Sequence, residues 1–325
     1  MAIRNRLVGT VAIFSILVTI IAIQQHLNVL LDIARTYSTF YPLLQSHLDL
    51  IYRYPAPALT VEAPPKIIHS VALGNVNIDR YHDAMASCRQ LHSDWEFKHW
   101  TDDNATDFIM QHYPRVFPHY CGYYQDIQRA NVLRYAVLHH YGGVYLDLDV
   151  TCLVALDSTP LMRLPFVSPG AHPAGVNNAF IISQKGHAFL SHLLRSVPSH
   201  DLHWGWPIRL PYVENMFSAG CMFFSNMWMS YARALVSGRA LDKVHVLGDE
   251  NGRLAPHMLR GLVTTPLMAH GGASSWHGWD AALILTIGKY YLFVVIAATL
   301  AATLVIVSLV RYCLCGRVRR RRMSG

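Results

Sequence analysis

The feature that most restricts the fold of this chain is a helical pattern that ends at two glycines and runs directly into a hydrophobic strand with two aspartates. The stretch covers residues 124–153. Gly142 and Gly143 predict the end of the helix, because glycine accepts the backbone conformation that closes one. Apolar side chains recur before them at helical spacing and predict a helix with one buried face. These side chains are Ile127, Ala130, Leu133, Val137 and Tyr141.

The same helix carries a second, polar set of side chains. They are Gln128, Asn131, Arg134 and Tyr135. Residues three, four and seven apart lie on one side of a helix, so these four predict a continuous polar face. We expect that face to meet a sugar or a phosphate next to the aspartates.

Asp147 and Asp149 stand two residues apart in the strand-like segment VYLDLDV. Because side chains alternate along a strand, the spacing predicts both carboxylates on one face and the apolar neighbours on the other. Two carboxylates at the end of a buried strand are costly unless a cation lies beside them. Oxygen ligands suit Mg²⁺ or Mn²⁺. A D-x-D pair alone is typical of a solvated turn, but between a helix, two glycines and a hydrophobic strand it predicts a divalent metal site.

Strands and helices alternate from Pro65 onward, which predicts an α/β fold. The domain begins with a β-rich run over 65–74. A helix over 79–92, a strand over 95–100 and a helix over 102–110 follow, with Thr101 as the N-cap of the last. The preceding residues are rich in proline near their end and read as a stem rather than a domain.

Both ends of the chain are apolar enough to predict membrane-spanning helices. Residues 7–23 carry no charge, and a helix from 7 to 31 would be roughly 37 Å long, enough for a hydrocarbon core of about 30 Å. A cleaved signal peptide is the alternative. Residues 290–310 are also uncharged and precede an arginine cluster. Basic flanks stay in the cytosol, so both termini are predicted to be cytoplasmic and the region between the spans lumenal.

The predicted organisation therefore has five parts. They are a signal anchor over 1–31, a lumenal stem over 32–64, a catalytic domain over 65–280, a juxtamembrane segment with the second span over 281–310, and a basic cytoplasmic tail over 311–325.

Charge excludes one class of partner. The formal net charge is +7, but residues 32–280 hold 18 of the 27 basic residues and all 20 acidic ones, which leaves that region at −2. Nucleic-acid binding by the central domain therefore lacks electrostatic support. Four cysteines would be lumenal, where disulfides form, although their pairing cannot be read from spacing.

The block RANVLRYAVLHHYGGVYLDLDV resembles the D-x-D signature of a glycosyltransferase group that includes fungal α-mannosyltransferases and large clostridial glucosylating toxins. The likeness extends from Pro65 to Asp280. It implies a GT-A fold, a nucleotide-sugar donor, Mn²⁺ (or Mg²⁺) and retention of the anomeric configuration. It departs from the group at Asn131, where an aspartate is usual.

The resemblance also implies roles for individual residues. Asp149 would hold the metal on the diphosphate, and Asp147 would contact ribose and metal. Arg134 would bind the donor sugar or its phosphate, and Asn131 a sugar hydroxyl. The remaining residues assigned to the donor are Gln128, Tyr135, Tyr145, Asn178, Ser275 and Trp276.

Near the C-terminal side, HGGASSWHGWD narrows the resemblance to fungal inositol phosphorylceramide mannosyltransferases. Such enzymes transfer mannose from GDP-mannose to a sphingolipid in the Golgi membrane. His270 and His277 flank the SSW segment, and either could bind metal or phosphate. An ordinary loop near the membrane explains both histidines equally well, and turn chemistry explains Asn178 equally well.

Two other functions stay open on the sequence. One is a glycoprotein N-glycan α-mannosyltransferase of the same group. The other is a catalytically weak regulatory membrane subunit, for which Asn131 is the best argument. If the chain is the enzyme, a separate regulatory membrane subunit stays open as its binding partner. The intact D-x-D pair and Arg134 favour catalysis.

Overall fold

The structure is a computed structural model that describes residues 2–57, 63–205, 208–272 and 277–290, together with residues 299, 300, 303 and 307. The chain divides into two compact units, Met1–Trp276 and His277–Gly325. The second unit contains α9 (Trp279–Lys289). All other elements described below belong to the first unit.

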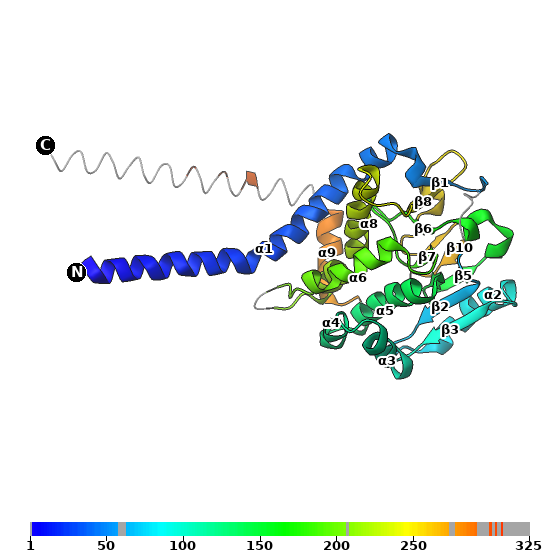
Figure 1. The fold of residues 1–325 in the computed structure, drawn as a ribbon, viewed down its shortest axis with the longest axis horizontal. Helices are drawn as coiled ribbons and strands as arrows, with labels where there is room; N and C mark the ends of the chain where they lie inside the picture. Colours follow the sequence, from blue (N-terminus) through cyan, green and yellow to red (C-terminus); the bar gives the residue numbers. More distant parts are fainter. Residues whose placement is uncertain are drawn as a thin grey trace. The chain divides into compact units, whose positions relative to one another are not determined.

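A mixed sheet forms the centre of the first unit (Figure 1). Within the described residues it has seven strands in the order β1-β8-β6-β7-β4-β2-β3. Only β7 runs antiparallel to its neighbours. The strands are β1 (Ile51–Arg53), β2 (Ile67–Val71), β3 (Glu96–Trp100), β4 (Gly143–Leu146), β6 (Phe166–Pro169), β7 (Phe180–Ser183) and β8 (His245–Gly248). A second sheet of three strands has the order β5-β10-β9, with β5 (Val150–Cys152), β9 (Val263–Thr264) and β10 (Met268–His270).

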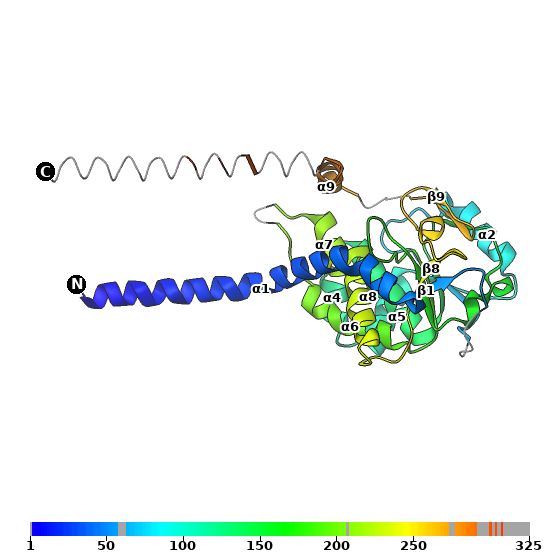
Figure 2. The same ribbon diagram turned by 90° about the horizontal axis from the view of Figure 1, so that it is seen from above.

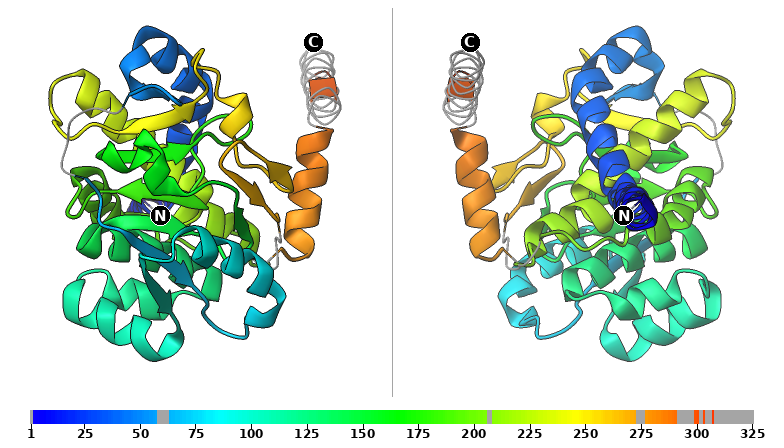
Figure 3. Two further views of the ribbon diagram at one scale, coloured as in Figure 1. Left: turned by 90° about the vertical axis from the view of Figure 1, so that its right-hand side faces the viewer. Right: turned by 90° about the vertical axis from the view of Figure 1, so that its left-hand side faces the viewer.

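Helices cover the central sheet on both sides (Figures 1 and 3). On one face α5, α6 and α8 pack side by side, and Tyr145 and Ile181 of the sheet join their core. On the other face Val144 and Ile182 pack with α2 and the small sheet. This alternation is what a strand buried on both faces requires. The helices are α1 (Ala2–Ser46), α2 (His82–Leu91), α3 (Asp102–His112), α4 (Phe117–Gly122), α5 (Asp126–Tyr141), α6 (Ala188–His200), α7 (Pro211–Ser218) and α8 (Cys221–Val236).

The prediction of membrane-spanning helices is wrong for the described residues, among which no helix is long and apolar enough to cross a membrane. The first apolar run does not stop at Leu31 but continues as one helix, α1, through the polar residues Gln24, His26 and Asp32. Of the second predicted span, 290–310, the structure describes only residues 290, 299, 300, 303 and 307. The rest of that run and the tail over 311–325 lie outside the described residues.

The predicted stem also differs from the structure, because much of it belongs to the folded unit. The last part of α1 packs on α8 (Figure 2), where Phe40 is fully buried with its ring 6.0 Å from that of Trp228. Thr36 donates a 2.7 Å hydrogen bond to Asn226. Residues 51–53 then add the edge strand β1 to the sheet. Buried side chains at helical spacing bring this segment into the core.

The helix–glycine–glycine–strand block forms as predicted up to Leu146. Gly142 and Gly143 have φ of 72° and 99°. A Cβ on Gly143 would lie 2.5 Å from the carbonyl oxygen of Ile67, so the close pairing of β4 with β2 needs glycine there. The predicted strand, however, ends at Leu146. Residues 147–149 form a turn closed by a 3.1 Å hydrogen bond from Val150 N to Asp147 O.

Three buried histidines make the stability of this fold dependent on pH. Burial lowers the pKa of His69, His187 and His245 to about 4. His69 and His187 each use one ring nitrogen as an acceptor, from Trp100 Nε1 and Phe189 N respectively, so protonation would break those bonds.

We therefore expect the free energy of unfolding to fall as the pH drops from about 6.5 toward 4. In this window the unfolded histidines bind protons and the folded ones do not, which costs about 1.4 kcal/mol per pH unit for each histidine. Urea unfolding at several pH values measures the slope, and His69→Gln should reduce it by about one proton. A free energy of unfolding that stays constant between pH 7 and 5 contradicts this expectation.

Candidate functional site

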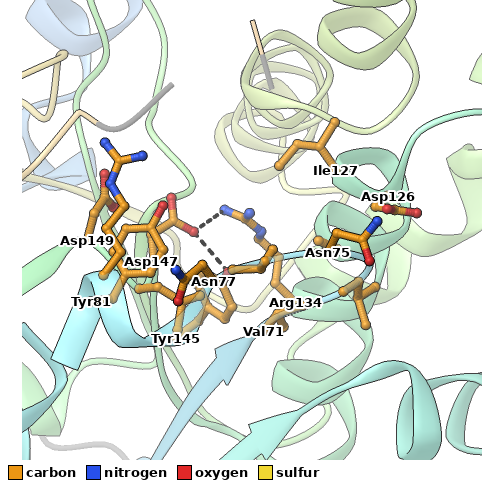
Figure 4. A pocket seen from close by; sticks show the side chains of 15 residues that line it. Val71, Asn75, Asn77, Tyr81, Asp126, Ile127, Arg134, Tyr145, Asp147 and Asp149 are labelled. Atoms are coloured by element: carbon orange, nitrogen blue, oxygen red, sulfur yellow. Dashed lines mark hydrogen bonds and ion pairs between the residues drawn. The ribbon is translucent and has the colours of Figure 1, made fainter. Parts of the chain in front are cut away.

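A cleft of about 480 Å³ opens at the carboxyl ends of β2 and β4 (Figure 4). This is the edge of an open α/β sheet at which ligands usually bind. The loop after β2 lines one wall, and α5 and the turn after β4 line the others. The polar lining residues are Asn75, Asn77, Arg80, Tyr81, Asp126, Arg134, Tyr145, Asp147 and Asp149.

The loop after β2 is pressed against the start of α5. Gly74 has φ of 68°, and a Cβ at that position would collide with the carboxylate of Asp126. The backbone N–H of Gly74 donates a 2.7 Å hydrogen bond to Asp102. Glycine is needed here for both the backbone conformation and the close approach. The wall of the cleft formed by residues 75–81 is thereby fixed relative to α5.

Asp147 and Asp149 of the cleft lining lie beside His270, and the three could hold a metal ion, since one ligand atom of each lies within 4.8 Å of the others. His270 Nε2 is 3.7 Å from Asp149 Oδ1. His270 arrives through sheet pairing, because β10 runs antiparallel to β5 with His270 opposite Val150. Val150, which follows Asp149 in the chain, is therefore the strand partner of His270, and this pairing brings His270 next to Asp149.

The donor set fits a divalent cation. Nδ1 of His270 lies 2.6 Å from the carbonyl oxygen of Gly261. A carbonyl only accepts, so the proton is on Nδ1 and the lone pair of Nε2 is directed to the side of Asp149. Two carboxylates and one neutral imidazole are ligands that suit Mn²⁺ or Mg²⁺. The predicted metal ligands Asp147, Asp149 and His270 are thus brought together by the fold.

Asp147 is held by two further side chains (Figure 4). Arg134 Nη1 is 3.1 Å from Asp147 Oδ1, and the hydroxyl of Tyr145 donates to the same oxygen over 2.9 Å. Burial raises the pKa of the Asp147 carboxyl above its ordinary value, against the opposing effect of Arg134, and the Asp149 carboxylate adds to the rise. A bound cation would relieve this cost of placing two carboxylates together.

Arg134 itself is nearly inaccessible and well supported. Its guanidinium donates a 2.8 Å hydrogen bond to the carbonyl oxygen of Asn178 and lies 4.5 Å from the centre of the Tyr145 ring. Its Nε has no acceptor among the described residues, although it is buried. The guanidinium therefore binds Asp147 through Nη1, while the N–H of Nε is left without an acceptor among the described residues.

The predicted polar face of α5 is only partly correct. Gln128, Asn131 and Tyr135 do not line the cleft but are buried against α7 and α8. Their partners are protein groups: Gln128 donates to Ser218, Asn131 to Asn215, and Tyr135 to the carbonyl of Ala219, each over 2.8 Å. Residues 127, 130 and 134 face the cleft instead. One residue along a helix turns the side chain by about 100°, which separates the two sets.

Asn178 joins this internal network rather than the cleft. Its Nδ2 donates to Asn131 Oδ1 over 3.1 Å and to the Tyr135 hydroxyl over 2.8 Å. Its carbonyl holds Arg134, so it acts on the site through the arginine. Asn131, where the resembling group usually has an aspartate, is hydrogen-bonded to Asn178 and Asn215 in this structure.

Three predicted residues are not placed at the cleft. Ser275 and Trp276 lie outside the described residues, and their donor contacts stay predictions. His277 belongs to the second unit, and its role as a metal ligand stays a prediction as well.

Sequence reasoning missed the residues of the loop after β2, above all Asn77, Arg80 and Tyr81. The available signal was their position directly after the first predicted strand of a parallel sheet, where binding loops occur. Asp126 was missed for a related reason, since it precedes the apolar pattern of α5 and opens the helix.

A family model matches the segment of the chain that contains the D-x-D pair. Residues 79–163 match the model of the glycosyltransferase sugar-binding region containing a DXD motif. The matched segment includes Arg80, Arg134, Asp147 and Asp149. Among solved structures, the PaToxG glycosyltransferase gives a TM-score of 0.40 at 14% identity, over 67% of this chain and 83% of that one.

Curated relatives are similar over much of the chain. Inositol phosphoceramide mannosyltransferase 3 of Schizosaccharomyces pombe is 32% identical over 73% of this chain and 62% of its own length. Mannosyl phosphorylinositol ceramide synthase SUR1 of Saccharomyces cerevisiae is 36% identical over 52% of this chain and 43% of its own length. The chain thus spans less than two thirds of these relatives. With the D-x-D block in the matched segment and at the cleft, the chain belongs to the glycosyltransferase family whose sugar-binding region contains a DXD motif.

Proposed function

We propose that this chain transfers mannose from GDP-mannose to inositol phosphorylceramide, with retention of the anomeric configuration. The observation that carries the proposal is the group Asp147, Asp149 and His270, whose two aspartates line one cleft together with Arg134. The names of the relatives support mannose as the sugar and inositol phosphoceramide as the acceptor. GDP-mannose as the donor and retention rest on the resemblance of the D-x-D block.

The reaction exchanges one bond at the anomeric carbon. The bond from this carbon to the diphosphate oxygen breaks, a bond to an inositol hydroxyl oxygen forms, and the hydroxyl proton passes to the departing diphosphate. Departure of the diphosphate limits the rate, because negative charge develops on it. Asp149, Asp147 and His270 would hold Mn²⁺ or Mg²⁺, which supplies positive charge to the diphosphate when bound.

The protein's own part is to position these groups before the reaction. Arg134 and Tyr145 fix one oxygen of Asp147, and the hydrogen bond from His270 to Gly261 fixes the imidazole. Groups held in advance need no rearrangement as charge develops, which is the main source of electrostatic catalysis. Arg134 adds a positive charge that stays in place throughout the reaction.

We also propose that the enzyme works in the Golgi lumen. The disulfide between Cys88 and Cys152, which ties α2 to β5, favours an oxidising compartment. Protease protection of the folded unit in sealed vesicles tests this location.

The activity is tested with purified protein, Mn²⁺ and radiolabelled GDP-mannose. Inositol phosphorylceramide in detergent micelles and a high-mannose glycoprotein serve as competing acceptors. We expect label in the lipid and an α-configured product by nuclear magnetic resonance. Label in the glycoprotein alone would favour the alternative acceptor, and no transfer to either would contradict the proposal. UDP-glucose in place of GDP-mannose tests the donor.

A further inference from the structure

One cation on the cleft wall has no part in the interactions described so far. Arg80 lies in the 3₁₀ turn Ile78–Tyr81 of the loop after β2, and its side chain is exposed and lines the cleft. Asn77 caps this turn by accepting a 3.1 Å hydrogen bond from Asp79 N. Asn77 and Arg80 both line the cleft.

The Arg80 side chain lies over the ring of its neighbour in the chain. The guanidinium carbon lies 6.0 Å from the centre of the Tyr81 ring. Tyr81 lines the same cleft as Asp149 and Arg134, and all three are labelled in Figure 4. The loop after β2 therefore brings Arg80 to the same cleft as Arg134, from a different segment of the chain.

The other two arginines near this cleft are engaged by carboxylates, whereas Arg80 is not. Arg134 pairs with Asp147, and Arg129 pairs with Asp102 and Asp126. In the described part of the chain no carboxylate lies within 4.0 Å of the Arg80 guanidinium. An exposed arginine without a partner is ordinary on a surface. On the wall of a polar cleft, the N–H groups of its guanidinium are available to bind an anion.

A count of charges shows what that anion should be. The carboxylates of Asp147 and Asp149 cancel a divalent cation, and Asp126 is paired with Arg129, which leaves the positive charge of Arg134. The diphosphate of a nucleotide sugar carries two negative charges, so one stays unbalanced in a partly buried site. Unbalanced charge there is costly, and Arg80 is the group that removes it.

We propose that Arg80 binds the diphosphate of the nucleotide-sugar donor, with its planar guanidinium against the phosphate oxygens. The inference rests on the proposed function, because it assumes a diphosphate donor. It does not depend on the base or the sugar. Arg80 would compensate the diphosphate charge from the loop after β2, and Arg134 from α5.

The test is calorimetric titration of the purified full chain with GDP in the presence of Mn²⁺. We expect Arg80→Ala to weaken GDP binding about tenfold or more, since a charge-assisted contact is lost. Arg80→Lys should weaken it less, and Arg80→Glu more, because the order follows charge. Arg115→Ala is the matched control: Arg115 is exposed between α3 and α4, away from the cleft lining, and GDP affinity should not change.

Two results overturn the assignment of Arg80. One is a GDP affinity of Arg80→Ala within about twofold of wild type. The other is an Arg80→Glu variant that binds no more weakly than Arg80→Ala, since a structural role would not follow charge. Thermal unfolding of each variant shows whether the fold is retained.

A parallel titration with UDP separates this inference from the proposed function. If the wild type binds UDP more tightly than GDP, the donor proposed above is wrong. Arg80→Ala should then weaken UDP binding by the same factor, because both ligands carry the diphosphate. If GDP is preferred and Arg80→Ala has no effect, the assignment of Arg80 fails alone. A wild type that binds neither overturns both.

Discussion

Asp149→Asn is expected to lower mannosyl transfer at least about a hundredfold while the chain stays folded. Asparagine has the shape of aspartate but lacks the charge that holds a divalent cation. The backbone of Asp149 is unaffected, so its 2.8 Å hydrogen bond from Gly271 N should persist. Initial rates at saturating Mn²⁺ give the effect on activity, and thermal unfolding monitors the fold.

Asp107→Asn is the control for this substitution, because Asp107 is an exposed carboxylate of α3 outside the cleft lining. It should retain full activity. His270→Ala should raise the Mn²⁺ concentration needed for half-maximal activity, since it removes one proposed ligand and leaves both carboxylates. Asp149→Asn activity within about threefold of wild type, or about 0.7 kcal/mol in the barrier, would show that Asp149 does not hold the metal.

Arg134→Met is expected to impair both stability and activity. It removes the partner of Asp147 and the donor to the Asn178 carbonyl. A carboxylate left without its partner in a largely buried position is strongly destabilising. Because the Asp147 side chain keeps 28% exposure, we expect a loss of about 2 kcal/mol in the free energy of unfolding. Activity should fall at least about a hundredfold, since the fixed positive charge at the diphosphate is gone.

The double variant Arg134→Met with Asp147→Asn separates the two effects. It removes both members of the ion pair, so urea unfolding should show part of the stability restored. Activity should stay low, because the site then lacks a metal ligand and a cation. The contrary result is a free energy of unfolding that falls in the double variant by the sum of the losses in Arg134→Met and Asp147→Asn. Arg134 would then stabilise the fold by something other than its ion pair with Asp147.

Local patterns were sufficient for the elements around the site. The helix now seen as α5, the glycines that end it and the strand β4 follow from residues that are neighbours in the chain. Hydrophobic periodicity and glycine conformation act over a few residues, which is why sequence reasoning recovers them. The turn at 147–149 was missed because apolar and acidic residues alternate through it as they would in a strand. Only the pairing with neighbouring strands shows that β4 ends at Leu146.

Long-range pairing was beyond the reach of these patterns. His270 meets Asp149 because β10 pairs with β5 in one register, and the two strands are more than one hundred residues apart in the chain. The joining of residues 32–53 to the core depends on the surface that α8 and β8 offer. Neither contact leaves a periodic signal in its own segment.

The sequence alone determined that this chain carries an acidic pair after a buried strand and an arginine on the helix before that strand. These residue types predicted a metal-dependent sugar transfer. Tertiary structure alone decided which polar residues reach the cleft. Packing against α7 and α8 turned Asn131 inward to Asn215, while Arg134 faces the cleft and Arg80 joins it from a different segment. The physical reason is that a residue's type is local, but the direction in which a helix faces is set by the elements that bury it.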